Sequence, residues 1–312
     1  MWKIVRGFDP NKKRYSKESF LDTNELLLPV STKDKAEQKY IVQWAEASSS
    51  SRPAVVFVPG FLTEISKEKQ MDSWTSSVVE LAKAHDFAAY GLYWPSNNLL
   101  KMLWGDTWTK AVGRLGIAAG IGAGIWRLRA AALRVNPVLA ATAIGGPAVA
   151  NIAQTWTKVV ELADKTSVNS ESWLSMFDRP VILIGHSLGG RIVLKASQHA
   201  KSTNILQTFA FAPAVLETDC DFSTICSNNT SQPAVFYSKN DLILNIVYRI
   251  GERTKKLPLG YAGIKEKNNQ GLVHSFNASK WNGKKMGHNG YNSQIASLLS
   301  HPGLQEGLGA WR

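Results

Sequence analysis

Cysteines and metal-binding patterns are scarce in this sequence, and their scarcity excludes several classes of protein. The two cysteines, Cys220 and Cys226, lie in one polar stretch. Two are too few for a disulfide-rich scaffold, and free thiols are the default inside cells. No further ligands stand near them at zinc-finger or zinc-ribbon spacing. The sequence therefore predicts a fold that needs no metal and no cofactor.

Targeting and nucleic-acid signals are also missing. The first residues, Met1 to Arg6, contain no apolar segment like that of a secretory signal peptide. Basic residues are scattered in pairs such as Lys255-Lys256 and Lys284-Lys285, without a long basic run or a nucleic-acid-binding motif. These absences favour a cytoplasmic protein and argue against nucleic acid as its partner.

The composition itself is that of a globular protein with a basic surface. The chain has 312 residues, of which 44% are hydrophobic, and this length suits one α/β domain with insertions. Its formal net charge is +12. Such a charge predicts attraction to an anionic partner, such as a lipid surface or an acidic substrate.

The most informative segment runs from Pro180 to Val193 and contains the pattern G-x-S-x-G. An apolar run typical of a buried strand precedes it, and a helix-like run follows it. A sharp strand-to-helix turn would hold Ser187 in a strained backbone conformation with its hydroxyl exposed above the sheet. Gly185 and Gly189 are expected because a Cβ there would collide with the neighbouring strand and helix. The pattern predicts a nucleophilic serine, against the alternative of a plain glycine-rich turn.

Apolar runs separated by helical patterns predict a doubly wound, mostly parallel sheet. A helix is expected over 72–84. The expected strands are 40–42 (an edge strand), 54–58, 87–94, 180–184, 205–211, 233–237 and 272–276. The predicted organisation is a polar peripheral segment over 1–52, one α/β domain over 53–300 and a tail over 301–312.

An insertion at about 100–165 interrupts this pattern. Its central part, 111–157, consists of two apolar, small-residue arms separated by arginines. Three interpretations remain open: a transmembrane helix, an interfacial lid suited to anionic headgroups, or two helices packed over the sheet as a buried cap.

A nucleophilic serine needs a base, and the base needs an acid that fixes its tautomer. In α/β hydrolases the acid follows the serine in the chain and the histidine comes last. Asp241 is the preferred acid because it follows the strand 233–237, at the carboxyl edge of the sheet. Asp219 and Asp221 are its rivals, and the alternative role for Asp241 is a helix cap.

His288 is the preferred base because it follows the last strand in a glycine-flanked loop that can return over Ser187. Of the other downstream histidines, His199 follows the turn on a helix, His274 lies in a strand, and His301 lies in the polar tail. The expected oxyanion donors are the backbone N–H groups of Leu188 and Phe61. His186, inside the G-x-S-x-G pattern, is interpreted as structural.

These motifs together resemble a known family. They run in order from Phe57-Val58-Pro59-Gly60-Phe61-Leu62, through Gly185-His186-Ser187-Leu188-Gly189 and Tyr237-Ser238-Lys239-Asn240-Asp241, to Gly287-His288-Asn289-Gly290-Tyr291. The chain is similar to the α/β hydrolases that include the transmembrane and coiled-coil domain-containing proteins. The resemblance implies an α/β-hydrolase fold and supports Ser187, Asp241 and His288 as a triad, but it supplies no substrate.

The sequence as a whole predicts a serine hydrolase of carboxylic esters that acts through an acyl-enzyme. The apolar insertion and the basic surface favour a lipid or acyl ester at an anionic membrane surface. Thioesterase, amidase or peptidase activity would use the same residues. The alternative is a non-catalytic scaffold that binds lipid or protein through the insertion.

Overall fold

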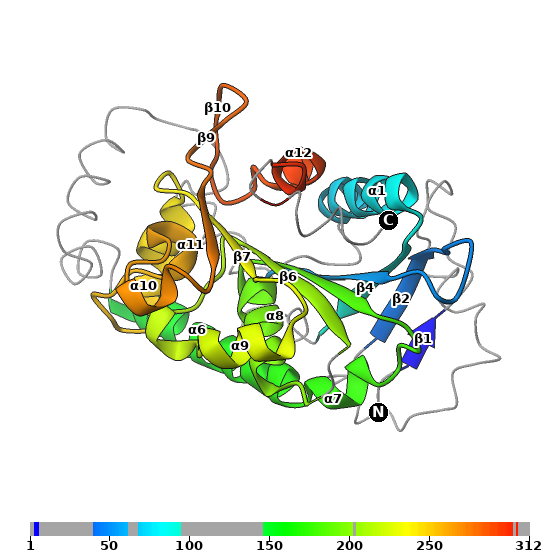
Figure 1. Cartoon of the computed structure of the whole chain (residues 1–312). Helices are drawn as coiled ribbons and strands as arrows, with labels where there is room; N and C mark the ends of the chain where they lie inside the picture. Colours follow the sequence, from blue (N-terminus) through cyan, green and yellow to red (C-terminus); the bar gives the residue numbers. More distant parts are fainter. Residues whose placement is uncertain are drawn as a thin grey trace.

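The computed structural model describes residues 3–5, 40–61, 68–94, 146–201, 204–301 and 304, and Figure 1 shows their arrangement. A twisted sheet lies between two layers of helices. Helices α6, α8 and α9 cover one face, and α1 and α12 lie over the other. Their bounds are Glu68–His85 for α1, Gly146–Val168 for α6, Leu188–His199 for α8, Phe222–Asn228 for α9 and Ile295–Leu299 for α12.

Within the part of the chain that the structure describes, the sheet has eight strands in the order β1-β2-β4-β3-β5-β6-β7-β8. The strands β3 to β8 are parallel, and β2 pairs antiparallel with β4. The bounds are Lys3–Val5 (β1), Tyr40–Ala45 (β2), Ala54–Val58 (β3), Ala88–Tyr93 (β4), Val181–His186 (β5), Ile205–Phe211 (β6), Ala234–Tyr237 (β7) and His274–Asn277 (β8). The predicted doubly wound sheet is confirmed, and its topology and helical layers are those of an α/β-hydrolase fold.

Two expectations for the N-terminal segment 1–52 were wrong. The strand expected at 40–42 is not an edge strand, because β1 pairs with it on its outer side. Nor is this strand peripheral, since Ile41, Val42 and Trp44 are buried in the core. The segment therefore contributes two strands to the sheet.

The central strands β3 and β5 are buried at every residue. Parallel strands covered on both faces have no solvent side, so their sequences are continuous apolar runs rather than alternating ones. This is why the strand at 54–58 could be predicted with its correct bounds.

The last part of the predicted insertion is the helix α6. Its Trp156, Val159 and Ala163 side chains are buried in the core, and the helix packs on α8. The rest of the insertion, from about 100 to 145, lies outside the described residues. Among the helices that the structure describes, none combines the length and the apolar character needed to cross a membrane.

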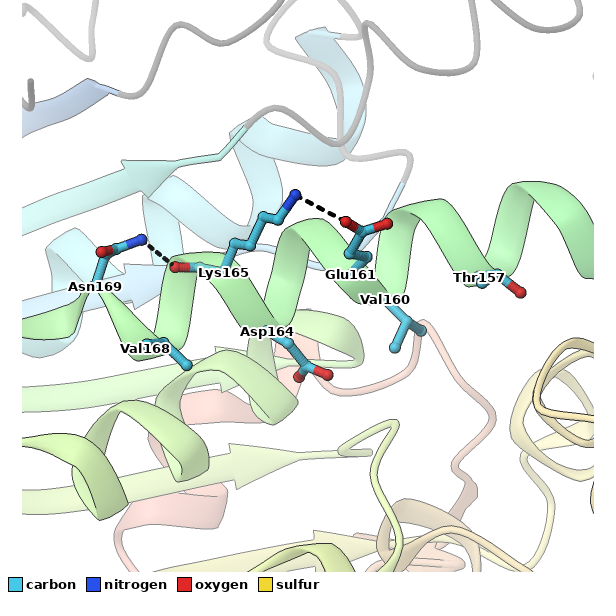
Figure 2. A pocket seen from close by; sticks show the side chains of 7 residues that line it. All are labelled: Thr157, Val160, Glu161, Asp164, Lys165, Val168 and Asn169. Atoms are coloured by element: carbon cyan, nitrogen blue, oxygen red, sulfur yellow. Dashed lines mark hydrogen bonds and ion pairs between the residues drawn. The ribbon is translucent and has the colours of Figure 1, made fainter.

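The exposed side of α6 borders a shallow hollow of about 490 Å³ (Figure 2). Its lining residues all come from α6 and the residue that follows it: Thr157, Val160, Glu161, Asp164, Lys165, Val168 and Asn169. None of the predicted catalytic residues lines this hollow, so the predicted chemistry must lie elsewhere.

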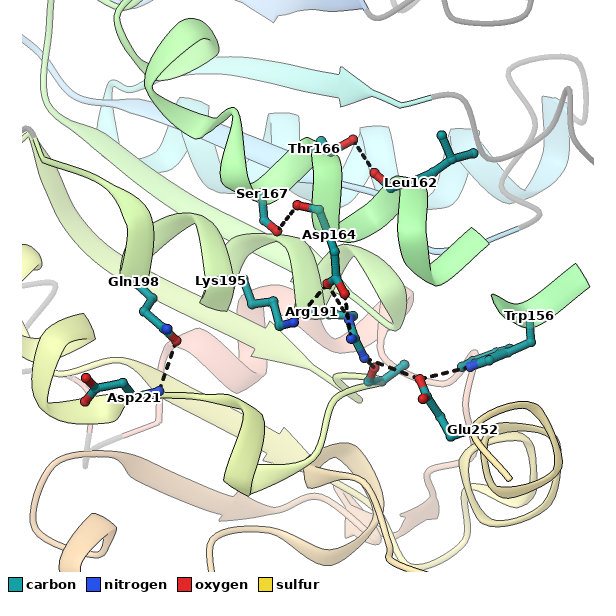
Figure 3. A network of polar contacts seen from close by, with 11 residues as sticks. Trp156, Leu162, Asp164, Thr166, Ser167, Arg191, Lys195, Gln198, Asp221 and Glu252 are labelled. Carbon is teal, nitrogen blue, oxygen red and sulfur yellow. Dashed lines mark hydrogen bonds and ion pairs between the residues drawn. The ribbon is translucent and has the colours of Figure 1, made fainter. Parts of the chain in front are cut away.

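A buried ionic network fixes α8 against α6. The guanidinium of Arg191, whose side chain is only 6% exposed, binds both carboxylate oxygens of Asp164 at 2.8 and 2.9 Å (Figure 3). Glu252 accepts from Arg191 at 3.4 Å and from the indole of Trp156 at 3.1 Å. Burial alone would raise the pKa of Asp164, but the hydrogen bonds and charges of Arg191 and Lys195 hold it below its ordinary value. The network thereby holds the helix that follows Ser187.

Replacing Arg191 by methionine is expected to lower the free energy of unfolding by about 3 kcal/mol, because two carboxylates lose a buried partner. This loss of stability is at the lower end of the range of about 3–5 kcal/mol for breaking a buried ion pair, because Lys195 still lies 3.0 Å from Asp164. Urea unfolding at pH 7 measures it. The control is Lys165→Gln, which removes an exposed ion pair with Glu161 and should cost under about 0.5 kcal/mol. Equal effects of the two variants would contradict the assignment.

The network also predicts how stability depends on pH. Because the folded-state pKa of Asp164 is depressed, its contribution is complete above its ordinary value of 3.8 and is lost as the pH falls through the lower, folded value. The wild-type protein should therefore lose more stability than Arg191→Met between pH 5 and pH 3.

Candidate active site

Ser187 is the single residue that connects a strand to the following helix. Strand β5 ends at His186, helix α8 begins at Leu188, and Ser187 has φ 58° and ψ −120°. A side-chain-bearing residue in this region costs about 1–3 kcal/mol, so the surrounding structure must hold it there. The Ser187 N–H donates to the carbonyl of Phe211 at 2.9 Å, and the Ser187 carbonyl accepts from Ala214 at 3.0 Å. Strand β6 and the loop after it therefore hold the turn in place.

Two glycines allow the turn to pack closely. A Cβ at Gly185 would lie 2.3 Å from the carbonyl oxygen of Gly189, and one at Gly189 would lie 2.0 Å from the carbonyl oxygen of Val58. Backbone atoms that close have no room to move aside. The predicted need for glycine at both positions thus has a direct steric cause.

The structure brings Ser187, His288 and Asp241 into one chain of hydrogen bonds. The Ser187 hydroxyl lies 3.0 Å from Nε2 of His288, and Nδ1 of His288 lies 2.6 Å from Oδ2 of Asp241. A carboxylate accepts, so Nδ1 carries the proton and Nε2 is left to accept from the serine. Asp241 is fully buried, and its other oxygen, Oδ1, accepts from the Leu244 N–H at 2.9 Å. This is the geometry in which a serine hydroxyl can pass its proton to an oriented base.

The family of the chain follows from a match over most of its length. A family profile described as "Protein of unknown function (DUF726)" matches residues 46–305. The chain belongs to this family. No curated protein shows significant similarity to it.

Solved structures resemble this DUF726 protein only distantly. A poly(3-hydroxybutyrate) depolymerase, LpqC, from Bordetella parapertussis is 15% identical, with 87% of each chain covered and a TM-score of 0.41. Est1E from Butyrivibrio proteoclasticus is 11% identical over 87% of this chain and 94% of that chain, with a TM-score of 0.37. The Pyrococcus furiosus esterase Pf2001 is 10% identical over 88% and 96%, with a TM-score of 0.33. Similarity at this level assigns no activity to the DUF726 chain.

Neither rival acid is placed on His288 in the DUF726 structure. Asp221 caps helix α9, because its Oδ1 accepts from the Thr224 N–H at 3.1 Å. Asp219 is the last residue of a short, exposed 3-10 helix, Glu217–Asp219. The alternative for Asp241, a helix cap, is realised together with the contact to His288, since its two oxygens serve one role each.

The rival histidines occupy other elements and make other contacts. His199 is exposed at the last residue of α8, and His274 begins strand β8. The ring of His301 packs against Phe276 and Trp281, with centroids 4.7 and 5.6 Å apart. Of the downstream histidines, His288 is the one that the structure places on the serine.

The turn after β3 lies against Ser187. A Cβ at Gly60 would lie 2.9 Å from the Cβ of Ser187, so only glycine lets the backbone pass this closely. The indole of Trp94 donates to the Pro59 carbonyl at 2.9 Å and holds the turn. Leu188, the first residue of α8, is fully buried, and Phe61 is half-buried. The two expected oxyanion donors thus belong to segments that flank Ser187.

His186 is the residue that the sequence interpretation undervalued. Its Nε2 lies 2.8 Å from the carbonyl oxygen of His288, and its ring packs against those of Trp74 and His288. Burial, with the nearby charge of His288, lowers the pKa of His186 to about 3. Its position next to Ser187 was visible in the sequence, but its contact with His288 was not.

Among the residues that the structure describes, no cluster of three or more histidine, cysteine, aspartate or glutamate side chains could hold a metal ion.

Proposed function

We propose that the protein is a serine hydrolase that cleaves carboxylic esters through an acyl-enzyme. The observation that carries the proposal is the continuous hydrogen-bonded chain from Ser187 through His288 to the buried Asp241, with the serine in a strained turn. A structural serine would not need that strain, and a structural histidine would not need both partners.

The proposed reaction has two halves. Ser187 Oγ attacks the ester carbonyl while its proton passes to His288 Nε2, and the N–H groups of Leu188 and Phe61 stabilise the oxyanion. His288 then gives that proton to the leaving alcohol, which leaves an acyl-enzyme. Next, His288 takes a proton from a water whose oxygen attacks the acyl carbon. The second tetrahedral intermediate then collapses: the bond between the acyl carbon and Ser187 Oγ breaks, the acid is released, and His288 gives the proton taken from water to Ser187 Oγ. Asp241 stabilises the imidazolium in both halves.

A fluorophosphonate probe tests the proposal directly, since it labels only activated serines. We expect the folded wild type to be labelled and the modified peptide to contain Ser187, with no labelling of heat-denatured protein or of folded His288→Ala. No labelling of folded wild type, with or without lipid vesicles, would overturn the proposal and leave the non-catalytic scaffold. A panel of esters, thioesters and amides would then define the scissile bond.

For the substrate we propose a lipid or acyl ester presented at an anionic membrane surface, with the protein bound peripherally. A hairpin beside the site supports this. Strands β9 (Lys280–Trp281) and β10 (Lys284–Lys285) are joined by Asn282 and Gly283, and the hairpin projects from the body of the protein (Figure 1). Its three lysines are exposed. Such a projecting cationic element favours contact with anionic headgroups.

The hairpin is tied to the loop that carries Asp241. The Lys239 N–H donates to the Ser279 hydroxyl at 2.8 Å, and Met286, at the end of the hairpin, stands two residues before His288. Leu242, next to Asp241 in this loop, is 43% exposed, so the loop presents an apolar side chain to solvent. This combination of groups is typical of surfaces that bind lipid interfaces.

Changing the three hairpin lysines to glutamine is expected to weaken binding to vesicles that contain anionic lipid by about 100-fold, at roughly fivefold per lysine. Co-sedimentation at low and high salt measures it. The matched control changes Lys255, Lys256 and Lys265 to glutamine, which removes the same charge from exposed positions outside the hairpin. Equal loss in both variants would show that net charge, not the hairpin, drives binding.

A further inference from the structure

We propose that His186 is a positioning residue that holds the general base over the nucleophile by donating a hydrogen bond from its Nε2–H to the main-chain carbonyl of His288. The inference rests on the proposed function. It goes beyond it by giving the variable residue of the G-x-S-x-G pattern a defined part in the site.

The direction of this bond follows from its chemistry. A carbonyl oxygen can only accept, so the proton must be on Nε2 of His186, 2.8 Å away. Burial of the ring disfavours its charged form, so at neutral pH His186 has one proton, on Nε2, and a bare Nδ1. It is therefore a fixed donor that does not compete with His288 for protons.

The ring is held on several sides, which makes the donor rigid. The Trp74 ring of α1 and the His288 ring each lie 4.8 Å from it, centroid to centroid. A Cβ at Gly60 would lie 3.3 Å from its Nδ1, so the turn after β3 also packs against the ring. His186 is only 4% exposed. Because β5 ends at His186, the donor is part of the same rigid strand that positions Ser187.

The acceptor, by contrast, lies in a loop that needs an anchor. His288 follows Gly287, where an added Cβ would meet nothing within 4 Å, and a Gly290–Gly287 hydrogen bond of 3.1 Å closes a turn around it. The Ser238 hydroxyl donates to the Met286 carbonyl and fixes the loop on the side of Asp241. The bond from His186 fixes it on the side of Ser187. Two adjacent residues then determine the distance between Ser187 Oγ and His288 Nε2: His186 holds the backbone of His288, and Ser187 carries Oγ.

Two substitutions separate the donor from the ring. His186→Phe keeps an aromatic ring between Trp74 and His288 but has no N–H, whereas His186→Gln loses the ring and places an amide N–H near the position of Nε2. We expect His186→Phe to lower kcat for a soluble ester by about 100-fold with KM unchanged, since a displacement of about 1 Å has that effect. His186→Gln should retain kcat within about fivefold. His199→Gln, at the exposed end of α8, is the control and should behave as wild type.

A proton NMR measurement tests the role of His186 without any substrate. The 2.6 Å contact between His288 Nδ1 and Asp241 should give a proton resonance far downfield in the NMR spectrum of the wild type. We expect the resonance to be lost or shifted in His186→Phe and kept in His186→Gln. If His186→Phe does not fold, His186→Asn replaces it, because its shorter side chain cannot reach the carbonyl.

The outcomes distinguish this proposal from the proposed function. The positioning role would be overturned if kcat and the resonance were kept in His186→Phe and lost in His186→Gln, or if both were reduced equally in the two variants. Neither result would contradict the proposed hydrolase activity. A wild type that cleaves no ester and takes up no fluorophosphonate would overturn the hydrolase. In that case the resonance alone would still support or refute the bond from His186.

Discussion

Ser187→Ala is expected to lower the rate of ester hydrolysis by about 10⁴- to 10⁶-fold. The reason is that no other group can form the covalent intermediate, while the oxyanion donors and the binding surface remain. The fold should persist, because alanine occupies the strained φ of 58° at a cost similar to that of serine and loses only the hydroxyl. Initial rates with a soluble ester, beside thermal unfolding, measure both quantities.

The control for this substitution is Ser227→Ala, which removes an exposed serine hydroxyl in helix α9 and should leave the rate unchanged. The double variant Ser187→Ala/His288→Ala should be no slower than Ser187→Ala, because the two residues act as a unit. A rate for Ser187→Ala within tenfold of the wild type would show that the hydrolysis comes from another group or a contaminant.

Asp241→Asn is expected to lower kcat by about 10⁴-fold while the fold is kept. The asparagine can still accept the Leu244 N–H through its oxygen, as Oδ1 of Asp241 does at 2.9 Å. Its NH₂ group then faces Nδ1 of His288, so the imidazole must carry its proton on Nε2 and can no longer accept from Ser187. Steady-state kinetics should show the loss in kcat, with little change in the urea midpoint.

The matched control for the carboxylate is Asp221→Asn, which replaces the helix-capping aspartate of α9 by a residue that caps about equally well, so both stability and kcat should stay close to wild type. An Asp241→Asn variant with wild-type kcat would mean that His288 is oriented by other contacts. A large loss of kcat in Asp221→Asn would instead support Asp221 as the acid.

The sequence allowed the site to be predicted where its signals are local. The turn around Ser187 depends on glycines two residues away on either side, and the buried strands β3 and β5 are continuous apolar runs. Asp241 and His288 could be chosen because parallel strands present their carboxyl ends at one edge and the chain order is fixed.

The features that escaped prediction depend on contacts between distant segments. Strand β1 is three residues long, and its partner β2 begins at Tyr40, so no local pattern marks the pairing. The same holds for His186, whose acceptor is 102 residues away. Arg191 on α8 pairs with Asp164 on α6. Nothing in the sequence of either helix distinguishes these two residues from other charged residues.

The separation of 101 residues between Ser187 and His288 has a consequence for the life of a newly made chain. The last strand that the structure describes in this sheet ends at Asn277, so His288 is made after the serine and after every described strand of the sheet. Until His288 is in place, the chain has the serine hydroxyl without the base that the proposed mechanism requires. Under the proposed mechanism, hydrolytic activity therefore starts only after the segment carrying His288 has been translated and has docked on the finished sheet.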